Sequence, residues 1–102
     1  MKRTDYCGLL TLEDTGRRAC VAGWVQTKRD MGGVIFLDLR DREGVLQLVC
    51  DARHLTESDF ILAESMKNQS VIAATGEIRL RDPETVNPNL KTGLIELKVD
   101  KI

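Results

Sequence analysis

The chain has 102 residues, of which 42% are hydrophobic and 30% charged, a composition typical of one soluble globular domain with a modest core. Its formal net charge of −1 at pH 7 argues against a protein that holds nucleic acid by a general basic excess. The sequence has no apolar run as long as a signal peptide or a membrane span, so we expect a cytoplasmic protein without a membrane partner.

Alternating runs in the first half of the chain predict three strands, at residues 18–28, 34–40 and 45–50. Gly23 is expected at a bulge or bend where the first strand curves. The glycines of residues 29–33 permit the positive φ angles of a turn between the first two strands. In the third strand, alternation points Leu46, Leu48 and Cys50 inward and Val45, Gln47 and Val49 outward.

A helix and two more strands are predicted in the second half. Thr56, followed by Asp59, resembles a capping box that opens a helix to about Asn68. Its buried stripe would consist of Phe60, Leu62, Ala63 and Met66. Residues 71–81 and 94–102 alternate again and flank an ordered loop with both prolines. The residues expected inside these strands are Ile72, Ala74, Gly76, Ile78, Leu80, Ile95, Leu97 and Val99.

This element order predicts an all-β fold with one helix. Five strands with a helix between the third and fourth are the order of an OB-fold, a five-stranded Greek-key barrel. Its second and third strands, with the loops after the first and fourth strands, form the usual ligand face. We therefore expect residues 1–102 to form a single OB-fold domain.

Phe36 is the most informative residue of the second strand. Alternation sends Ile35 and Leu37 to the core and Phe36 to the polar side, beside Asp38. This placement forgoes core burial worth about 1.5–3 kcal/mol. Two interpretations stay open: the ring is a stacking platform for an unpaired base, or it is covered by a loop or a neighbouring domain.

The side of the strands that faces away from the core carries a set of groups suited to RNA. These residues are Phe36, Gln47, Arg79, Arg81 and Glu96. They supply a ring to stack, an amide and a carboxylate for base edges, and guanidinium groups for phosphates or bases. For each of these residues taken singly, a solvated strand face is the alternative, and it is favoured for Glu96 and Lys98. Arg29 falls on the core side of the first strand and joins the set only if that strand has ended or bulged.

No catalytic or metal-binding pattern is found in the sequence. A nucleophile elbow and a phosphate-binding glycine loop are both missing, and His54 is the single histidine. The three cysteines are far apart and are interpreted as free thiols, with Cys50 in the core. We expect no zinc site, no cofactor and no catalytic residue in this chain.

Carboxylates and arginines alternate near the end of the second strand. The carboxylates are Asp38, Asp41 and Glu43, and the arginines between them are Arg40 and Arg42. This pattern is interpreted as a solvated, self-neutralising turn rather than as an acid–base pair.

Several segments together resemble the N-terminal anticodon-binding domain of class II aspartyl-tRNA synthetases. The similarity rests on Gly23-Trp24-Val25, Lys28-Arg29-Asp30, Gly32-Gly33, the run from Ile35 to Gly44, and Gln47. Residues 6–10 and 86–96 favour the bacterial type of this aminoacyl-tRNA synthetase. The resemblance spans about residues 6–96.

The resemblance implies a role for each of six residues. Phe36 would stack on the middle uridine of the tRNA-Asp anticodon, and Gln47 would read a base edge. The anticodon pocket would be completed by Arg29, Arg79, Arg81 and Glu96. Met31 lies in the loop that, in this family, helps decide whether tRNA-Asn is charged as well.

The resemblance also implies what the parent enzyme does. That enzyme would be a cytoplasmic, homodimeric ligase of protein biosynthesis that attaches aspartate to tRNA-Asp with ATP and magnesium. Its catalytic domain would follow Ile102. The alternatives are a free-standing OB-fold module that binds single-stranded nucleic acid, and an OB domain that binds only protein.

Overall fold

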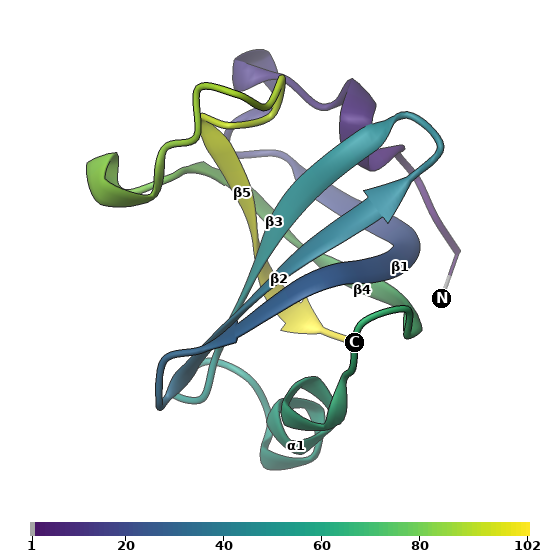
Figure 1. The fold of residues 1–102 in the computed structure, drawn as a ribbon, viewed down its shortest axis with the longest axis vertical. Coiled ribbons are helices and arrows are strands. Elements are labelled where there is room, and N and C mark those ends of the chain that lie inside the picture. The colour runs from purple at the N-terminus through teal and green to yellow at the C-terminus, as the bar shows by residue number, and fades with distance from the viewer. Residues whose placement is uncertain (1) are drawn as a thin grey trace.

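The structure, a computed structural model, describes residues 2–102. Its strands are β1 (Arg18–Asp30), β2 (Val34–Asp41), β3 (Gly44–Asp51), β4 (Val71–Leu80) and β5 (Ile95–Lys101). Its helices are α1 (Glu57–Ser65) and the short 3₁₀ helices η1 (Cys7–Leu9), η2 (Leu12–Asp14) and η3 (Pro83–Thr85) (Figure 1). The predicted fold, five strands with a helix between the third and fourth, is confirmed.

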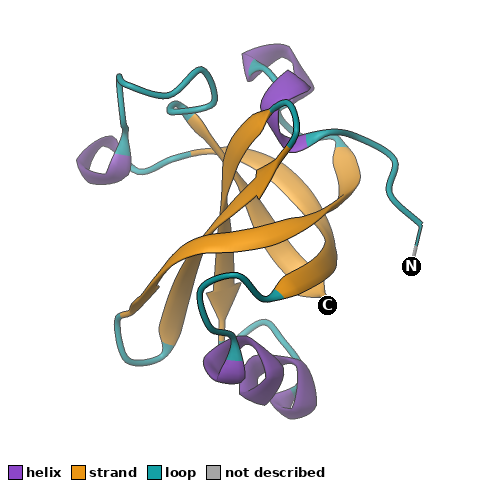
Figure 2. Cartoon of the chain, turned by 45° about the vertical axis from the view of Figure 1, so that its right-hand side comes forward, coloured by secondary structure: helices purple, strands orange, loops and turns teal. Residues whose placement is uncertain are grey.

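The five strands close into a barrel in the order β1-β2-β3-β5-β4. Neighbouring strands are antiparallel except β3 and β5, which are parallel. α1 lies at one end of the barrel, and the 3₁₀ helices lie toward the other end (Figures 1 and 2). The face formed by β1, β2 and β3 lies between these two ends (Figure 1).

Strand β1 closes the barrel because it pairs with two partners. Its first half pairs with β4 and its second half with β2, and Trp24 pairs with both. Gly23 lies beside this change of partner. A Cβ at Gly23 would lie 2.2 Å from the carbonyl oxygen of Arg40, so the close approach of the two backbones requires glycine.

The bulge of β1 lies at Gln26 rather than at Gly23. Val25 pairs with Leu39 and Thr27 pairs with Asp38, which leaves Gln26 without a partner on β2. One extra residue reverses the alternation of a strand. Val25 is fully buried, whereas Thr27 and then Arg29 are exposed on the outer face. The first strand thus bulges before Arg29, and Arg29 lies on the outer face with the other predicted site residues.

The core fills the barrel as alternation predicts for β2 and β5. Its fully buried side chains include Ile35, Leu37, Leu39, Leu46, Leu48, Ile78, Leu97 and Val99. The outward residues of β3 are nevertheless shielded from solvent, because Val45 and Val49 are also buried. The Thr92 hydroxyl donates to the Val45 carbonyl, so the loop before β5 covers Val45. Val49 lies between Phe36 and Lys98 on the neighbouring strands.

Helix α1 begins as predicted and ends early. The Thr56 side chain accepts from the backbone N–H of Asp59, but the helix ends at Ser65. The Lys28 ammonium group donates to the carbonyls of Glu64 and Met66, which satisfies carbonyl groups at this end. No helix within residues 2–102 is long and apolar enough to span a membrane.

Two residues predicted to be inside are exposed. Leu62 of α1 is 40% exposed because the helix contacts the core through Phe60, Ala63 and Met66 instead. Leu80 is 58% exposed. β1 begins at Arg18 opposite Glu77, so the end of β4 has a partner strand on one side only.

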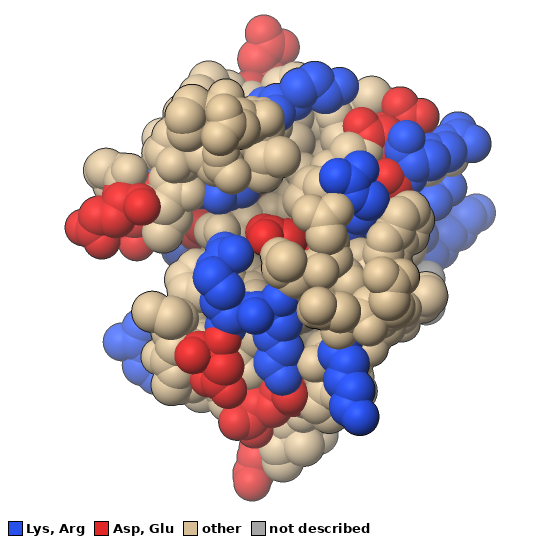
Figure 3. Space-filling view, viewed as in Figure 1, with Lys and Arg blue, Asp and Glu red and all other residues tan. Residues whose placement is uncertain are grey.

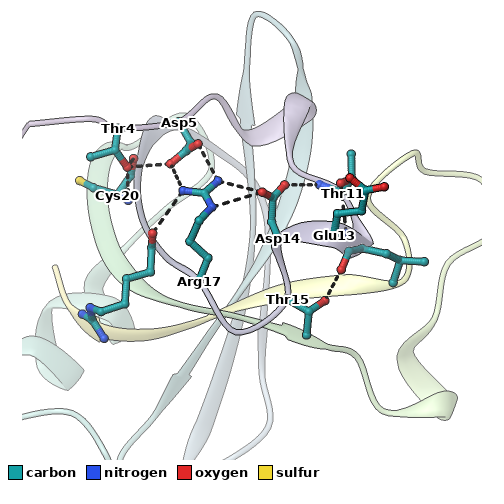
Figure 4. A network of polar contacts seen from close by, with 10 residues as sticks. Thr4, Asp5, Thr11, Glu13, Asp14, Thr15, Arg17 and Cys20 are labelled. Atoms are coloured by element: carbon teal, nitrogen blue, oxygen red, sulfur yellow. Dashed lines mark hydrogen bonds and ion pairs between the residues drawn. The ribbon is translucent and has the colours of Figure 1, made fainter.

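The segment before β1 is fastened to the barrel by polar contacts (Figure 4). The backbone N–H of Thr4 donates to the Cys20 carbonyl, and the Thr4 hydroxyl accepts from the Cys20 N–H. Arg17 Nη2 lies 2.9 Å from Asp5 Oδ1 and 3.0 Å from Asp14 Oδ1. The hydrogen bond from Arg17 holds the pKa of Asp5 below its ordinary value.

The turn after β2 is not fully solvated as the sequence suggests. Asp41 is buried, and its carboxylate accepts from the backbone N–H groups of Cys7 and Glu43. Asp41 therefore holds the N-terminal segment against the β2–β3 turn. All three cysteines are free and buried. Burial raises the pKa of Cys7, with a further contribution from Asp41, and raises that of Cys50 to about 12.

Candidate nucleic-acid interface

Phe36 and Arg29 lie side by side on the outer face of the barrel. They are direct partners on β2 and β1, and the Arg29 guanidinium carbon is 5.7 Å from the centroid of the Phe36 ring. This distance is within the range of a cation–π interaction, about 6 Å. Phe36 is half-buried, so part of its ring remains open on the face that alternation predicts.

Gln47 is the centre of a hydrogen-bonded cluster on this face. Its Oε1 accepts from Arg29 Nη2 at 2.9 Å and from Arg81 Nη1 at 3.3 Å. Its Nε2 donates to Glu96 Oε1 at 3.0 Å. The amide is therefore used at both ends, and the side chain is fully buried. Gln47 joins side chains from four strands or strand ends into one unit.

Glu96 is buried between partners on both neighbouring strands. It pairs with Gln47 of β3 and with Arg79 of β4. Arg79 Nη2 lies 3.5 Å from Glu96 Oε2, and Glu96 is only 6% exposed. The alternative of a solvated strand face is wrong for Glu96, because these two side chains cover it.

Arg81 is anchored where the chain leaves β4. Its Nε donates to the Ile95 carbonyl at 2.9 Å, and its Nη1 donates to the Thr85 carbonyl at 2.8 Å. Its buried Nη2 has no hydrogen-bond partner among the described residues. Burial lowers the pKa of Arg81, and the nearby charges of Asp38 and Glu96 oppose this change. Arg81 Nη2 is therefore an unused donor on a guanidinium group that is held in place by two other hydrogen bonds.

Asp38 belongs to the same cluster, although the sequence analysis assigned it to a solvated turn. Its Oδ2 lies 3.2 Å from Arg29 Nη1 and also accepts from the Thr27 hydroxyl. Asp38 is the partner of Gln47 across β2 and β3. The signal that could have found it is its alternation, which puts it on the same side of β2 as Phe36.

The cluster forms one wall of a pocket of about 330 Å³. Its lining residues are Arg29, Asp38, Gln47, Arg81, Glu84, Thr85, Val86, Asn87 and Leu90. The pocket thus lies between the cluster and the loop that begins with η3. It offers guanidinium donors, carboxylate and carbonyl acceptors, and a nearby aromatic ring, which suits a planar ligand with hydrogen-bonding edges. No group of three or more metal-ligating side chains occurs within residues 2–102.

The structure brings together all six residues predicted for the site. Five are linked by the hydrogen bonds around Gln47 and Glu96, and Phe36 joins through Arg29. Residues 19–102 match the family described as the OB-fold nucleic acid binding domain. The chain belongs to this family.

The chain also matches part of the sequence of longer proteins. The chain is 50% identical over 101 residues to the aspartate–tRNA ligase of Staphylococcus carnosus (strain TM300) and 46% identical to that of Staphylococcus aureus (strain Newman). Each match covers 99% of this chain and 17% of the relative. The chain therefore spans less than a fifth of the length of these relatives.

Solved structures agree with this OB fold. Asparaginyl-tRNA synthetase from Pyrococcus horikoshii, complexed with asparaginyl-adenylate, has a TM-score of 0.80 and 27% identity, over 99% of this chain and 21% of that chain. OBody AM2EP06, bound to hen egg-white lysozyme, has a TM-score of 0.82 and 20% identity, over 99% of this chain and 91% of that chain. At this identity the second likeness concerns the fold alone.

Proposed function

We propose that this chain is the anticodon-recognition domain of an aspartate–tRNA ligase and that it binds the anticodon loop of tRNA-Asp. The observation that carries the proposal is the cluster around Gln47, which holds three arginines and two carboxylates beside the half-buried ring of Phe36. The identity of 50% with an aspartate–tRNA ligase supports the choice of aspartate.

In this proposal Phe36 stacks on the middle base of the anticodon. Stacking of a base on an aromatic side chain is worth about 1–3 kcal/mol. Arg29 already lies beside the ring, so it is in place to contact the same base or its phosphate. The partly open ring supports this role because a stacking platform needs accessible aromatic surface.

The remaining site residues form the edges that read the bases. Arg79, Arg81 and Glu96 offer donors and an acceptor held by strand pairing. Gln47 is occupied at both ends in the free domain. A base that Gln47 reads must therefore displace an arginine or Glu96, or accept from the second N–H of Nε2; otherwise Gln47 acts by holding the arginines in position.

The activity of the whole ligase belongs to regions of the relatives outside this match. We assign the attachment of aspartate to tRNA-Asp, with its ATP and magnesium, to those regions. The homodimer and the cytoplasmic location proposed for the parent enzyme rest on the same resemblance.

The proposal is tested by titrating the domain with RNA stem-loops. We expect the anticodon stem-loop of tRNA-Asp to bind at least tenfold more tightly than the same stem-loop with its middle uridine replaced by adenosine. Equal affinity for both, and for unrelated single strands of the same length, would contradict the proposal and favour a non-specific single-strand module. Binding of neither would contradict both.

A further inference from the structure

A second group of basic and aromatic side chains lies on the same face, away from the cluster around Gln47. We call Arg3, Tyr6, Trp24 and Arg42 the N-terminal patch. These residues line a pocket of about 320 Å³ together with Ala22, Gly23 and Asp41. The Tyr6 ring has the Arg3 guanidinium carbon 3.9 Å and the Arg42 guanidinium carbon 4.5 Å from its centroid.

The two arginines of the N-terminal patch keep much of their charge available. Arg42 is 71% exposed, and its ion-pair partner is Glu43, at 3.4 Å. Arg3 is exposed and donates to the Tyr6 hydroxyl at 2.9 Å. The carboxylate of Asp41 is buried and accepts from backbone N–H groups. The patch therefore presents two cations to solvent.

The arginines of the cluster around Gln47 differ from those of the N-terminal patch in their partners and in their burial. Arg29 is paired with Asp38 and Gln47, and Arg79 with Glu96. Arg81 is 7% exposed. A domain with a net charge of −1 needs local cations to neutralise phosphates, and each of these arginines already uses part of its donors on acceptors within the site. The N-terminal patch supplies further cations, and Figure 3 shows basic side chains, with acidic ones among them, on the side of the molecule where the N-terminal segment lies.

The N-terminal patch continues the outer face of β2. Alternation places Arg40 on the same side as Phe36, and Arg40 is the partner of Trp24. Four residues along a strand correspond to about 13 Å, so the patch is beyond the reach of a base stacked on Phe36. It lies where RNA backbone on one side of that base would pass. Trp24 is the only tryptophan of the chain and is 36% exposed.

We propose that the N-terminal patch is a second RNA contact, which binds backbone phosphates of the stem-loop outside the three anticodon bases. This inference rests on the function proposed above and adds to it. Arg3 and Arg42 neutralise phosphates, and Tyr6 holds both guanidinium groups in place. Trp24 forms the apolar edge of the contact.

The test measures the affinity of the tRNA-Asp anticodon stem-loop at several salt concentrations. The variants are Arg42→Gln and Arg3→Gln, and the control is Arg53→Gln in the turn between β3 and α1. The Arg53 side chain is 87% exposed and forms an ion pair with Asp51. Loss of one phosphate contact should reduce the slope of log K against log salt by about 0.7–0.9 and weaken binding several-fold at low salt.

The expected result is a smaller salt slope in both patch variants, with no change in the control or in the preference for the middle uridine. Arg42→Lys should keep the slope of the unmodified chain, because lysine retains the positive charge. Trp24 fluorescence should change on binding. Unchanged slopes in both patch variants, with or without a lower melting temperature, would overturn the second contact while the anticodon proposal stands. Absence of binding to any stem-loop would overturn both.

Discussion

Arg29 and Phe36 face each other across β1 and β2 because Gln26 is bulged out of the strand before them. Without this extra residue, alternation from Val25 onward would direct Arg29 into the barrel. The bulge therefore allows one strand to supply both core residues and a site residue.

Phe36→Ala separates a stacking role from a structural one. The ring is half-buried, whereas Leu37 is fully buried in the core. We expect Leu37→Ala to lower the free energy of unfolding by about 2–5 kcal/mol. Phe36→Ala should cost clearly less stability and weaken stem-loop binding by about 1–3 kcal/mol. Thermal melts and titrations of both variants make the comparison. A Phe36→Ala protein that melts as early as Leu37→Ala, and whose folded fraction binds normally, would contradict stacking.

Gln47→Leu should destabilise the domain although it places an apolar side chain in a buried position. The change leaves Glu96 and the guanidinium groups of Arg29 and Arg81 short of a partner. Each buried polar group left without a partner costs about 1–3 kcal/mol. Denaturant unfolding measures the loss. Gln26→Leu is the control at an exposed position, and equal stability of the two variants would show that the cluster contributes nothing to folding.

Deletion of Gln26 should be far more damaging than its replacement. The deletion requires Thr27 and Arg29 to turn toward the core or the β1–β2 register to slip. We expect a loss of about 4 kcal/mol or more, as when an unpaired charge is buried. Gln26→Ala should change stability by about 0.5 kcal/mol or less. If the two variants have similar melting temperatures, the bulge is not what directs Arg29 outward.

The contacts of Arg17 predict a dependence of stability on acid. The pKa values of Asp5 and Asp14 lie below the ordinary value of 3.8, for Asp5 chiefly because of Arg17 and for Asp14 chiefly because of the Thr11 N–H. A carboxyl group whose pKa is lower in the folded state stabilises the fold at pH values above its pKa in the unfolded state. This contribution is lost as the pH falls through its pKa in the folded state. The difference in melting temperature between the unmodified chain and Arg17→Gln should be constant above about pH 5 and shrink below pH 4. A difference that grows on acidification would have the wrong sign.

Alternation predicted the regular parts of the molecule and failed where contacts come from distant segments. The interior residues of β2 and β5 were found because β2 pairs with β3 without interruption and the register shift of β5 falls at Asp100, after Ile95, Leu97 and Val99. The sequence at Gln26 does not indicate a bulge. The bulge arises because Val25 pairs with Leu39 and Thr27 pairs with Asp38, the next residue along β2. The end of α1 depends on Lys28, which is far away in the sequence.

Burial of the polar site residues could not be predicted from single strands either. Gln47 and Glu96 are outward by alternation, yet they cover each other because β3 and β5 are neighbours in the barrel. Asp41 is buried because the N-terminal segment crosses it. In each case the partner lies tens of residues away along the chain, so local pattern carries no information about it.

The closed barrel also limits how any partner can attach. Each of the five described strands has a neighbour on both sides for part of its length, so no strand offers an edge that is free from end to end for an added peptide strand. A partner must therefore be recognised by side chains and loops. These can be substituted without loss of the hydrogen bonds that join the strands. The same closure leaves only short free edges as templates for edge-to-edge aggregation, so the domain should remain monodisperse at the high concentrations that titrations require.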